Sequence, residues 1–209
     1  MGIDRKIMKV YFNNHRIFKL NVGCGENILK GWLNSDYYSK NSKIFQLDAT
    51  KSLPFKSNVF HFVFCEHMIE HFPYFIGERF LSEVKRILKS NGKVRIATPN
   101  LRFLIDLFKS DKSKLQEKYI SWATKMFIKD VPLEHETFVI NNFVRAWGHQ
   151  FIYDEKTLRL SMEQAGFSEI TRCELNTSED NELKNLENVN RMPDGFLNLE
   201  TLILEGSKP

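Results

Sequence analysis

Short apolar segments alternate with turn signals along the first hundred residues of the chain. These segments have strand length and cover residues 17–22, 31–36, 44–48, 59–65 and 93–98. The run 59–65 is continuously apolar, which is typical of a strand buried on both faces of a parallel sheet. Before the last segment, Ile76, Phe80, Val84 and Ile87 recur at helical spacing on one face. The pattern predicts an α/β fold with a mostly parallel sheet.

The pattern changes after Pro99. The preceding helix is expected to end at Asn91-Gly92, as a left-handed C-cap would end it. Residues 101–151 contain two short amphipathic helical patterns, followed by an irregular stretch from Val131 onward. We interpret 101–151 as a helical insertion that covers the top of the sheet.

The chain returns to helix and strand patterns after this insertion. Asp154 is placed to cap a helix that Gly166 ends. Two last strands are expected at 169–175 and 199–204, and the Asn- and Glu-rich segment 176–195 between them is interpreted as a mobile loop. With neither an internal repeat nor a second core in the pattern, residues 1–209 are predicted to form a single domain.

Composition favours a packed globule. Hydrophobic residues make up 42% of the 209 residues, and 18 of these residues are phenylalanine. No stretch approaches the roughly 18 apolar residues of a membrane span, so none is expected. Cys24, Cys65 and Cys173 are an odd, widely spaced set, which indicates buried free thiols in a reducing cytosol and predicts a cytoplasmic protein. The net charge of +4 permits an anionic partner without requiring one.

The most informative motif is the glycine turn that follows the first apolar segment. Leu20-Asn21-Val22-Gly23-Cys24-Gly25 reads as a strand that runs directly into the turn, and Asp36 closes the next apolar segment. Glycines let a backbone approach a ligand closely, and a carboxylate at the next strand end accepts hydrogen bonds from ribose hydroxyls. Because the turn is G-x-G and lacks the third glycine of G-x-G-x-x-G, a ligand with a ribose but no diphosphate fits better than a dinucleotide.

Taken in order, the motifs resemble those of the class I methyltransferases that use S-adenosylmethionine. The matching pieces are LNVGCG, NSDY, LDATKSLPF, VFCEHMIEH, VKRILKSNGKVRIATPN and EKTLRLSMEQAGF. The resemblance implies a Rossmann-like, doubly wound, mostly parallel seven-stranded sheet with the helical insertion after strand five. Only about one helical turn fits between Gly25 and the second strand, as in a short-helix subset of the family similar to methyltransferase type 11.

The resemblance also implies a site for S-adenosylmethionine as cofactor. Gly23 and Gly25 would pass under its methionine part, Asp36 would accept from both ribose hydroxyls, and Asp48 with the Ala49 amide would hold the adenine edge. The cofactor-binding residues that it implies are Asn21, Gly23, Cys24, Gly25, Asp36, Asp48, Ala49, Cys65, Glu66 and His67. A local turn or cap is the alternative role for each aspartate, and packing is the alternative for Cys24.

A hydroxyl acceptor would require a base to take its proton, whereas a carboxylate or phosphate-like acceptor would need little such help. His149 and Tyr153 are the candidates in the stretch where the insertion rejoins the fold, with His71 and His135 in reserve. A structural role for His149 is the alternative. We expect the insertion to act as the lid over a small-molecule or sugar-like (glycan-like) acceptor.

The string His67-Met68-Ile69-Glu70-His71 also matches the inverted zinc-protease signature H-x-x-E-H. That reading requires a helix through the motif and a distant third ligand. Here the motif begins at the end of a buried strand, and Pro73 starts a new helix directly after it. The sequence therefore does not predict a metal, and Glu70 and His71 are expected to tether this turn.

Two other functions fit parts of the sequence. Lysines 114, 118, 125 and 129 form a stripe with Tyr119, Trp122 and Phe127 nearby, a pattern that can bind nucleic acid in an RNA- or DNA-directed methyltransferase. A solvated lysine face opposite packed aromatics is the preferred interpretation, so nucleic acid is not the expected partner. A non-catalytic methyltransferase-like binding protein is the third hypothesis. The retained set Gly23, Gly25, Asp36 and Asp48 argues against it.

Overall fold

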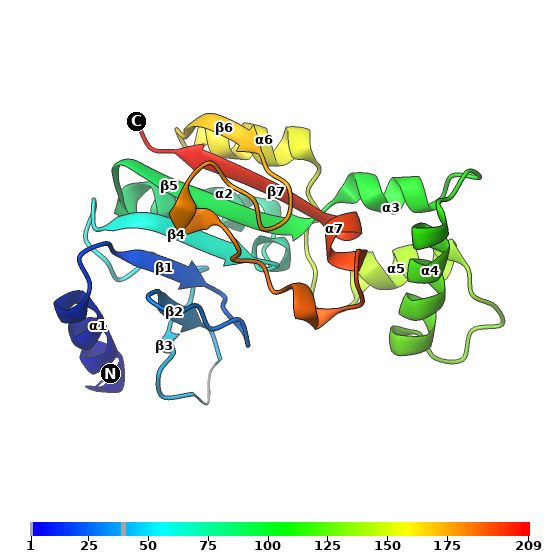
Figure 1. Cartoon of the computed structure of the whole chain (residues 1–209), viewed down its shortest axis with the longest axis horizontal. Coiled ribbons are helices and arrows are strands. Elements are labelled where there is room, and N and C mark those ends of the chain that lie inside the picture. Colours follow the sequence, from blue (N-terminus) through cyan, green and yellow to red (C-terminus); the bar gives the residue numbers. More distant parts are fainter. Residues whose placement is uncertain (1, 39–40) are drawn as a thin grey trace.

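The computed structural model describes residues 2–38 and 41–209, and its centre is a seven-stranded sheet (Figure 1). The strands lie in the order β3-β2-β1-β4-β5-β7-β6. Their bounds are β1 Lys19–Val22, β2 Leu33–Asp36, β3 Phe45–Gln46, β4 Phe60–Glu66, β5 Leu88–Pro99, β6 Ser168–Arg172 and β7 Thr201–Ser207. β1 to β5 pair in parallel, and β7 pairs antiparallel with both β5 and β6. The predicted Rossmann-like, mostly parallel sheet is confirmed.

Strand register brings the carboxyl ends of the first strands to one edge of the sheet. Val22 at the end of β1 lies opposite Ser35 in β2 and Cys65 in β4. Ser35 in turn pairs with Phe45 in β3. The segments that follow these strands therefore lie next to one another, which is where open α/β sheets bind ligands.

Seven α-helices and three short 3₁₀ helices surround the sheet in the described part of the chain. The α-helices are α1 Gly2–Asn14, α2 Tyr74–Ile87, α3 Leu101–Leu107, α4 Lys114–Phe127, α5 Glu136–Arg145, α6 Glu155–Gln164 and α7 Phe196–Glu200, and the 3₁₀ helices are η1 Ile69–His71, η2 Asn181–Leu183 and η3 Val189–Arg191. Asp154 caps α6 as predicted, by accepting from the Thr157 backbone N at 2.9 Å. Among the described residues, we find no helix with the length and apolar content to cross a bilayer.

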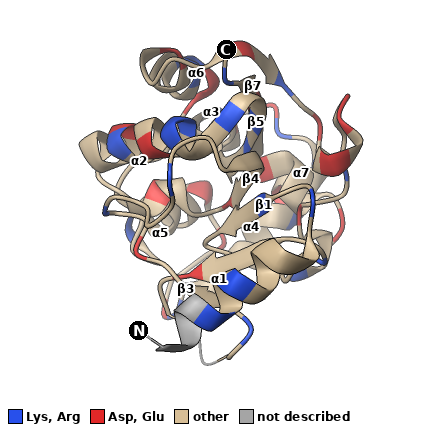
Figure 2. Cartoon of the chain, turned by 90° about the vertical axis from the view of Figure 1, so that its left-hand side faces the viewer, with Lys and Arg blue, Asp and Glu red and all other residues tan. Residues whose placement is uncertain are grey.

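One face of the sheet is covered by helices. Because side chains alternate along a strand, Leu20 and Val22 of β1 point to this face together with Val63, Val94 and Leu204 from neighbouring strands. The buried sides of α1, α2 and α6 complete this largest hydrophobic cluster. The outer side of α2 carries interleaved basic and acidic residues (Figure 2).

The opposite face is covered by the segment that we expected to be a mobile loop. Leu183 and Leu186 pack with Phe64, Ala97 and Ile203 of the sheet. In Figure 1 this segment crosses in front of the central strands. Apart from η2 and η3 the segment is irregular, as predicted, but buried residues such as Leu183 and Leu186 hold it against the sheet. Its polar composition gave no sign of these contacts, because the partners lie far away in the sequence.

Arg95 is the polar anchor of this face. It lies in β5 with no exposed surface. Its guanidinium donates to Glu187 at 2.6 Å, to Glu205, and to the Thr177 carbonyl at 2.7 Å. Glu187 also accepts from the backbone N of Asn176 at 2.9 Å. A buried cation with several acceptors thus fixes the path of the whole segment.

Other local predictions differ from the structure. The expected turn of helix between Gly25 and the second strand is absent, and α1, which no sequence signal indicated, packs there through Tyr11. The Tyr11 hydroxyl donates to the Lys19 carbonyl at 2.9 Å. α2 already ends at Ile87, so Asn91-Gly92 does not cap it. This pair lies in β5 instead, where register shifts between β4 and β5 and Asn91 N donates to Lys208 O at 2.8 Å.

The insertion lies beyond the carboxyl ends of β4 and β5 (Figure 1). The stretch from Val131 onward, expected to be irregular, contains α5. α3, α4 and α5 share a hydrophobic cluster to which α7 contributes Phe196. The first helical pattern rests on Leu101, Leu104, Ile105 and Phe108, and the second on Leu115, Tyr119, Trp122 and Met126. Ile105, Phe108 and Met126 are exposed, so the predicted apolar faces are only partly buried. We call residues 101–151 the lid.

We predict that Arg95→Ala lowers the free energy of unfolding by about 3–5 kcal/mol, because it leaves Glu187 and Glu205 as uncompensated buried charges. Urea denaturation measures the loss. Arg102→Ala, which removes a mostly exposed partner of Asp106, is the control and should cost no more than about 1 kcal/mol. Equal losses in the two variants would contradict the anchoring role.

Candidate functional site

A pocket of about 740 Å³ opens at the carboxyl edge of β1, β2 and β4. We call it the edge pocket. Its lining consists of Val22, Gly23, Gly25, Asp36, Tyr37, Tyr38, Leu47, Asp48, Ala49, Thr50, His67, Met68, His71, Phe72 and Trp147. Six of the predicted cofactor-binding residues lie here: Gly23, Gly25, Asp36, Asp48, Ala49 and His67.

The glycine turn forms the floor of this pocket. Gly23 and Gly25 both have positive φ, +67° and +50°, a conformation that L side chains rarely adopt. A Cβ at Gly23 would lie 2.4 Å from Cγ of Met68, so this glycine lets the turn approach the segment after β4. A Cβ at Gly25 would meet nothing within 4 Å. The turn is thus closely packed from beneath and open above Gly25.

Asp36 is held beside this turn. Its Oδ2 accepts from the Gly25 backbone N at 2.8 Å, and its Oδ1 accepts from Tyr38 N at 3.1 Å. Each carboxylate oxygen can accept more than one hydrogen bond. Asp36 therefore fixes the turn and still has acceptor capacity toward the pocket.

Asp48 lies across the pocket in a loop of its own. It accepts from the backbone N and the hydroxyl of Thr50, at 3.1 and 2.6 Å. The Thr50 hydrogen bond holds the pKa of Asp48 below its usual range, so the side chain is ionised at neutral pH. The same loop continues to Leu53, whose backbone N donates to Glu83 of α2 at 2.7 Å.

Four predicted cofactor residues do not line the edge pocket. Asn21 donates to the side chain of Asn34 at 3.0 Å, and Glu66 accepts from Asn27 and from the backbone N of Asn188. Cys24 and Cys65 are buried, and burial raises the pKa of the Cys24 thiol to about 11. These four side chains pack or form hydrogen bonds outside the pocket lining. Spacing in the sequence could not distinguish that role from contact with a ligand.

The Tyr153 prediction also requires correction. The side chain is fully buried, and a Cβ at Gly77 would lie 2.4 Å from its hydroxyl oxygen. Burial raises the pKa of this phenol. Tyr153 packs between the sheet and α2 and lines neither pocket described here, so we do not retain it as a base.

Several lining residues of the edge pocket were not predicted from the sequence. Tyr37 and Tyr38 follow Asp36 directly. Their position next to an acid at a strand end could have indicated that they line the pocket. Met68 lies inside the motif 67–71 and Phe72 directly after it, in the turn that follows β4. Trp147, with φ +55°, comes from the lid and had no local signal.

A second pocket of about 280 Å³ lies between the sheet edge and the lid. We call it the lid pocket. Its lining consists of His67, Glu70, His71, Pro99, Tyr119, Trp122, Phe127, Phe143, Trp147, His149, Arg191, Met192 and Glu200. It shares His67, His71 and Trp147 with the edge pocket. Aromatic rings dominate the lid side, and titratable groups dominate the sheet side.

Two acids are buried at the base of the lid pocket. Glu70 has no exposed surface, and burial raises its pKa to about 8. Glu200 accepts from the Tyr119 hydroxyl, lies 3.5 Å from an Arg191 guanidinium nitrogen, and has its pKa raised by burial. These groups make the pocket floor polar despite its aromatic walls.

The histidines at the boundary between the pockets are held differently. His67 has φ +47°, and its Nε2 lies 3.2 Å from the Thr201 hydroxyl oxygen. Burial lowers the pKa of His67 well below its usual range and also lowers that of His149. Nδ1 of His149 lies 2.7 Å from the Phe143 carbonyl oxygen. Because a carbonyl only accepts, this nitrogen carries a proton and Nε2 keeps its lone pair.

Other predicted candidates lie elsewhere. His135 accepts from Thr137 N as the N-cap of α5 and does not line either pocket. In the lysine stripe, Lys125 pairs with Glu134 at 3.0 Å, while Tyr119 is buried in the lid cluster. Tyr119 and Trp122 pack in the lid cluster, as the interpretation of a packed aromatic face predicts, whereas Phe127 is exposed.

Known proteins resemble this chain in sequence and in fold. The family described as "Methyltransferase domain" matches residues 27–96. An uncharacterized protein of Methanocaldococcus jannaschii is 28% identical over 150 residues, which are 66% of this chain and 63% of that protein. The chain thus spans less than two thirds of the length of this relative.

Solved structures share the fold at low sequence identity. A SAM-dependent methyltransferase of Archaeoglobus fulgidus aligns with a TM-score of 0.56 and 15% identity, covering 99% of this chain and 93% of that one. A SAM-dependent methyltransferase of Thermotoga maritima aligns with a TM-score of 0.52 and 18% identity, covering 99% of this chain and 91% of that one. In its matched segment and in its fold the chain is therefore similar to S-adenosylmethionine-dependent methyltransferases, as its motifs indicated.

The edge pocket suits an adenosyl ligand in shape and donor chemistry. The space above Gly25 admits a ligand close to the backbone, Asp36 offers acceptor capacity for hydroxyl groups, and Asp48 is an ionised acceptor on the opposite side. No side chain of the described residues fills the space within 4 Å of a Cβ at Gly25. The residues present therefore fit the cofactor of this class.

We predict that Glu83→Gln lowers stability by about 1–2 kcal/mol at neutral pH, because Glu83 accepts from Arg86, Leu53 N and the Ser52 hydroxyl. The Arg86 hydrogen bonds lower the pKa of Glu83 from 4.5 to about 2. The stabilisation is therefore complete above pH 4.5 and disappears as the pH falls toward 2.

Denaturation of wild type and Glu83→Gln from pH 7 to pH 2 measures this difference. Glu163→Gln, an exposed acid on α6, should show a small difference throughout that range. A Glu83 difference that stays constant from pH 7 to pH 2 would show that the carboxylate does not hold the Asp48 loop.

Proposed function

We propose that this domain is an active methyltransferase that binds S-adenosylmethionine in the edge pocket and methylates a small acceptor in the lid pocket. When bound, the cofactor would supply a methyl group from its sulfonium. Gly25, Asp36, Asp48 and Ala49 would hold it through the contacts expected from their motifs. The observation that carries the proposal is that the two pockets share a wall, formed by His67, His71 and Trp147.

The dimensions and lining of the lid pocket favour a small molecule. Its volume of about 280 Å³ lies near the lower end of ligand pockets. Trp122 and Phe127 offer flat apolar faces, and Arg191 and Glu200 offer charged hydrogen-bonding groups. A sugar-like or otherwise hydroxylated ring matches this combination, because its faces are apolar and its edge is polar.

Positioning would be the main contribution of the protein to the reaction, since holding two reactants in line can reach effective molarities of about 10⁵ M or more. For a hydroxyl acceptor, His149 and His71 are the bases available in the lid pocket. Nε2 of His149 is unprotonated in the tautomer fixed by Phe143, and its lowered pKa keeps the ring neutral near pH 7. The imidazole of His149 can then take a proton.

We predict that the protein binds S-adenosylhomocysteine and that Asp36→Asn raises the Kd about tenfold to hundredfold, the equivalent of losing a hydrogen bond to a charged acceptor. The asparagine keeps one acceptor oxygen for Gly25 N, so the turn itself should survive. Isothermal titration calorimetry measures the affinity, and thermal unfolding checks that the variant is folded.

Asp111→Asn, in the loop between α3 and α4, is the matched control and should bind like wild type. If the wild-type protein shows no binding and no thermal stabilisation at millimolar S-adenosylhomocysteine, the domain is a non-catalytic relative of this class. Equal affinities for wild type and Asp36→Asn would instead exclude the ribose role of Asp36.

A further inference from the structure

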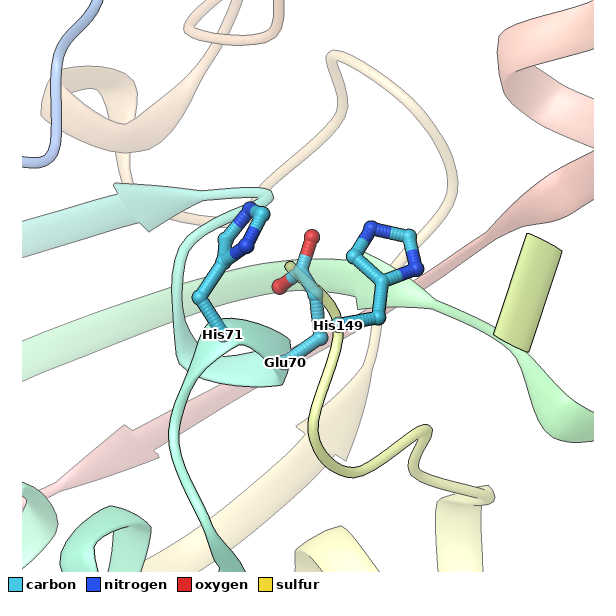
Figure 3. A group of neighbouring side chains, drawn as sticks. All are labelled: Glu70, His71 and His149. Atoms are coloured by element: carbon cyan, nitrogen blue, oxygen red, sulfur yellow. The ribbon is translucent and has the colours of Figure 1, made fainter. Parts of the chain in front are cut away.

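Three side chains converge at the floor of the lid pocket. Glu70 and His71 come from η1, and His149 comes from the end of the lid (Figure 3). One carboxylate oxygen and one nitrogen of each ring all lie within 4.8 Å of one another. Figure 3 shows the Glu70 carboxylate between the two imidazoles, with all three groups pointing to the same side.

The carboxylate has an unmatched oxygen. Glu70 Oε2 accepts from the Thr98 hydroxyl at 3.1 Å, whereas Oε1 is fully buried and has no hydrogen-bond partner among the described residues. Nδ1 of His67 lies 3.5 Å from Oε1, within ion-pair range, but donates no hydrogen bond to it. A buried carboxylate oxygen without a partner is costly, and a bound cation would remove this cost.

The surrounding hydrogen bonds orient the other donors. The proton on Nδ1 of His149 is fixed by the Phe143 carbonyl, which leaves Nε2 free to ligate. Metal-binding histidines usually donate their second N–H to a carbonyl or carboxylate in this way. The backbone carbonyl of Glu70 accepts from Gln150 N and Phe151 N, so the two segments that supply the donors are joined directly.

We propose that Glu70, His71 and His149 bind a divalent transition-metal ion, most favourably Zn²⁺. Two imidazoles and one carboxylate are a common set of three protein ligands for zinc, with a fourth position left for water or substrate. Mg²⁺ and Ca²⁺ prefer all-oxygen sites, so the two nitrogen donors select against them. Because all three residues line the lid pocket, the fourth position would face its interior.

The donors would have to move slightly closer on binding. With metal–ligand bonds of about 2.0–2.2 Å, two ligands of a tetrahedral ion lie about 3.4 Å apart. The present upper limit of 4.8 Å between donor atoms therefore requires a shift of about an ångström. Side-chain rotation of His71 and His149, which are only partly buried, can provide it.

This site differs from the zinc-protease reading of the same motif. That reading takes both histidines of H-x-x-E-H as ligands on one helix, whereas here His67 is directed toward Thr201 and the motif forms a 3₁₀ turn. The ligands are the glutamate and the second histidine, and the third ligand comes from the lid. The expectation that no metal binds is therefore replaced by this proposal.

The metal site adds to the proposed function. It rests on that function in one respect, because it assumes that the acceptor binds in the lid pocket. A hydroxyl that occupies the fourth position would lose its proton to water more readily, since a bound cation lowers the pKa of its oxygen ligands. The ion would then replace His149 and His71 as the group that promotes deprotonation. The acceptor class that follows is an oxygen nucleophile able to ligate a metal.

The test is metal binding by the full chain after treatment with EDTA. Zn²⁺ is titrated by calorimetry, and Co²⁺ is used as a spectroscopic probe whose visible absorption reports nitrogen and oxygen ligation. We expect one equivalent to bind wild type, and His71→Gln and His149→Gln each to weaken binding at least about tenfold. Glu70→Gln, which preserves the size of the side chain, should do the same.

His135→Asn is the control, since it removes an exposed imidazole while keeping a residue that can cap α5. It should bind Zn²⁺ like wild type. Absence of a stoichiometric site, or affinities that are unchanged in all three ligand variants, would overturn the proposal. So would a Co²⁺ spectrum showing thiolate ligation, because the donors would then include a cysteine, of which the chain has three.

The same protein samples separate this inference from the proposed function. S-adenosylhomocysteine binding without zinc binding would leave the methyltransferase proposal in place and remove the metal site. Zinc binding without S-adenosylhomocysteine binding would leave the metal site in place and remove the methyltransferase proposal. Circular dichroism of each variant confirms that loss of binding does not reflect loss of folding.

Discussion

The parallel register of β1, β2 and β4 is the constraint on which the rest of the structure depends. It aligns Val22, Ser35 and Cys65 across three strands, so that the glycine turn, Asp36 and the turn after β4 emerge side by side. None of these groups is unusual alone. Their proximity creates the edge pocket, and a shift of one residue in any strand would turn the buried side chains to the wrong face.

Glu70 connects this sheet edge to the lid. Its backbone carbonyl receives two N–H groups from residues 150 and 151, its Oε2 accepts from Thr98 on β5, and the residue lines the lid pocket. The lid therefore returns to the sheet at the point where both pockets meet. A buried acid with an unmatched oxygen is a poor stabiliser, and its position between two imidazoles indicates that its chemistry is the reason for its presence.

The two faces of the sheet are protected by different means. Helices cover one face with apolar side chains, whereas the other face is covered by an irregular, polar segment held by Arg95 and its acidic partners. This segment also tethers Glu66 and carries Arg191 into the lid pocket. Stability of the second face and composition of the lid pocket thus depend on the same stretch of chain.

Local patterns in the sequence were sufficient for the class of fold and for much of the edge pocket. The apolar runs of strand length, the glycine turn and the acids Asp36 and Asp48 depend on neighbours close in sequence. Their places in the sheet and at the edge pocket could therefore be predicted without coordinates. The same reasoning misplaced Tyr153 and missed Trp147, because burial of the first and exposure of the second are set by packing against distant elements.

The sequence by itself determined which residues could form strands, turns and caps, since those preferences arise within a few residues. Only the tertiary structure decided that segment 176–195 covers a sheet face, that Glu66 is a tether, and that His149 meets Glu70 and His71. Such pairings depend on contacts between distant segments, some of them more than 100 residues apart, such as Glu66 and Asn188. No local pattern encodes them.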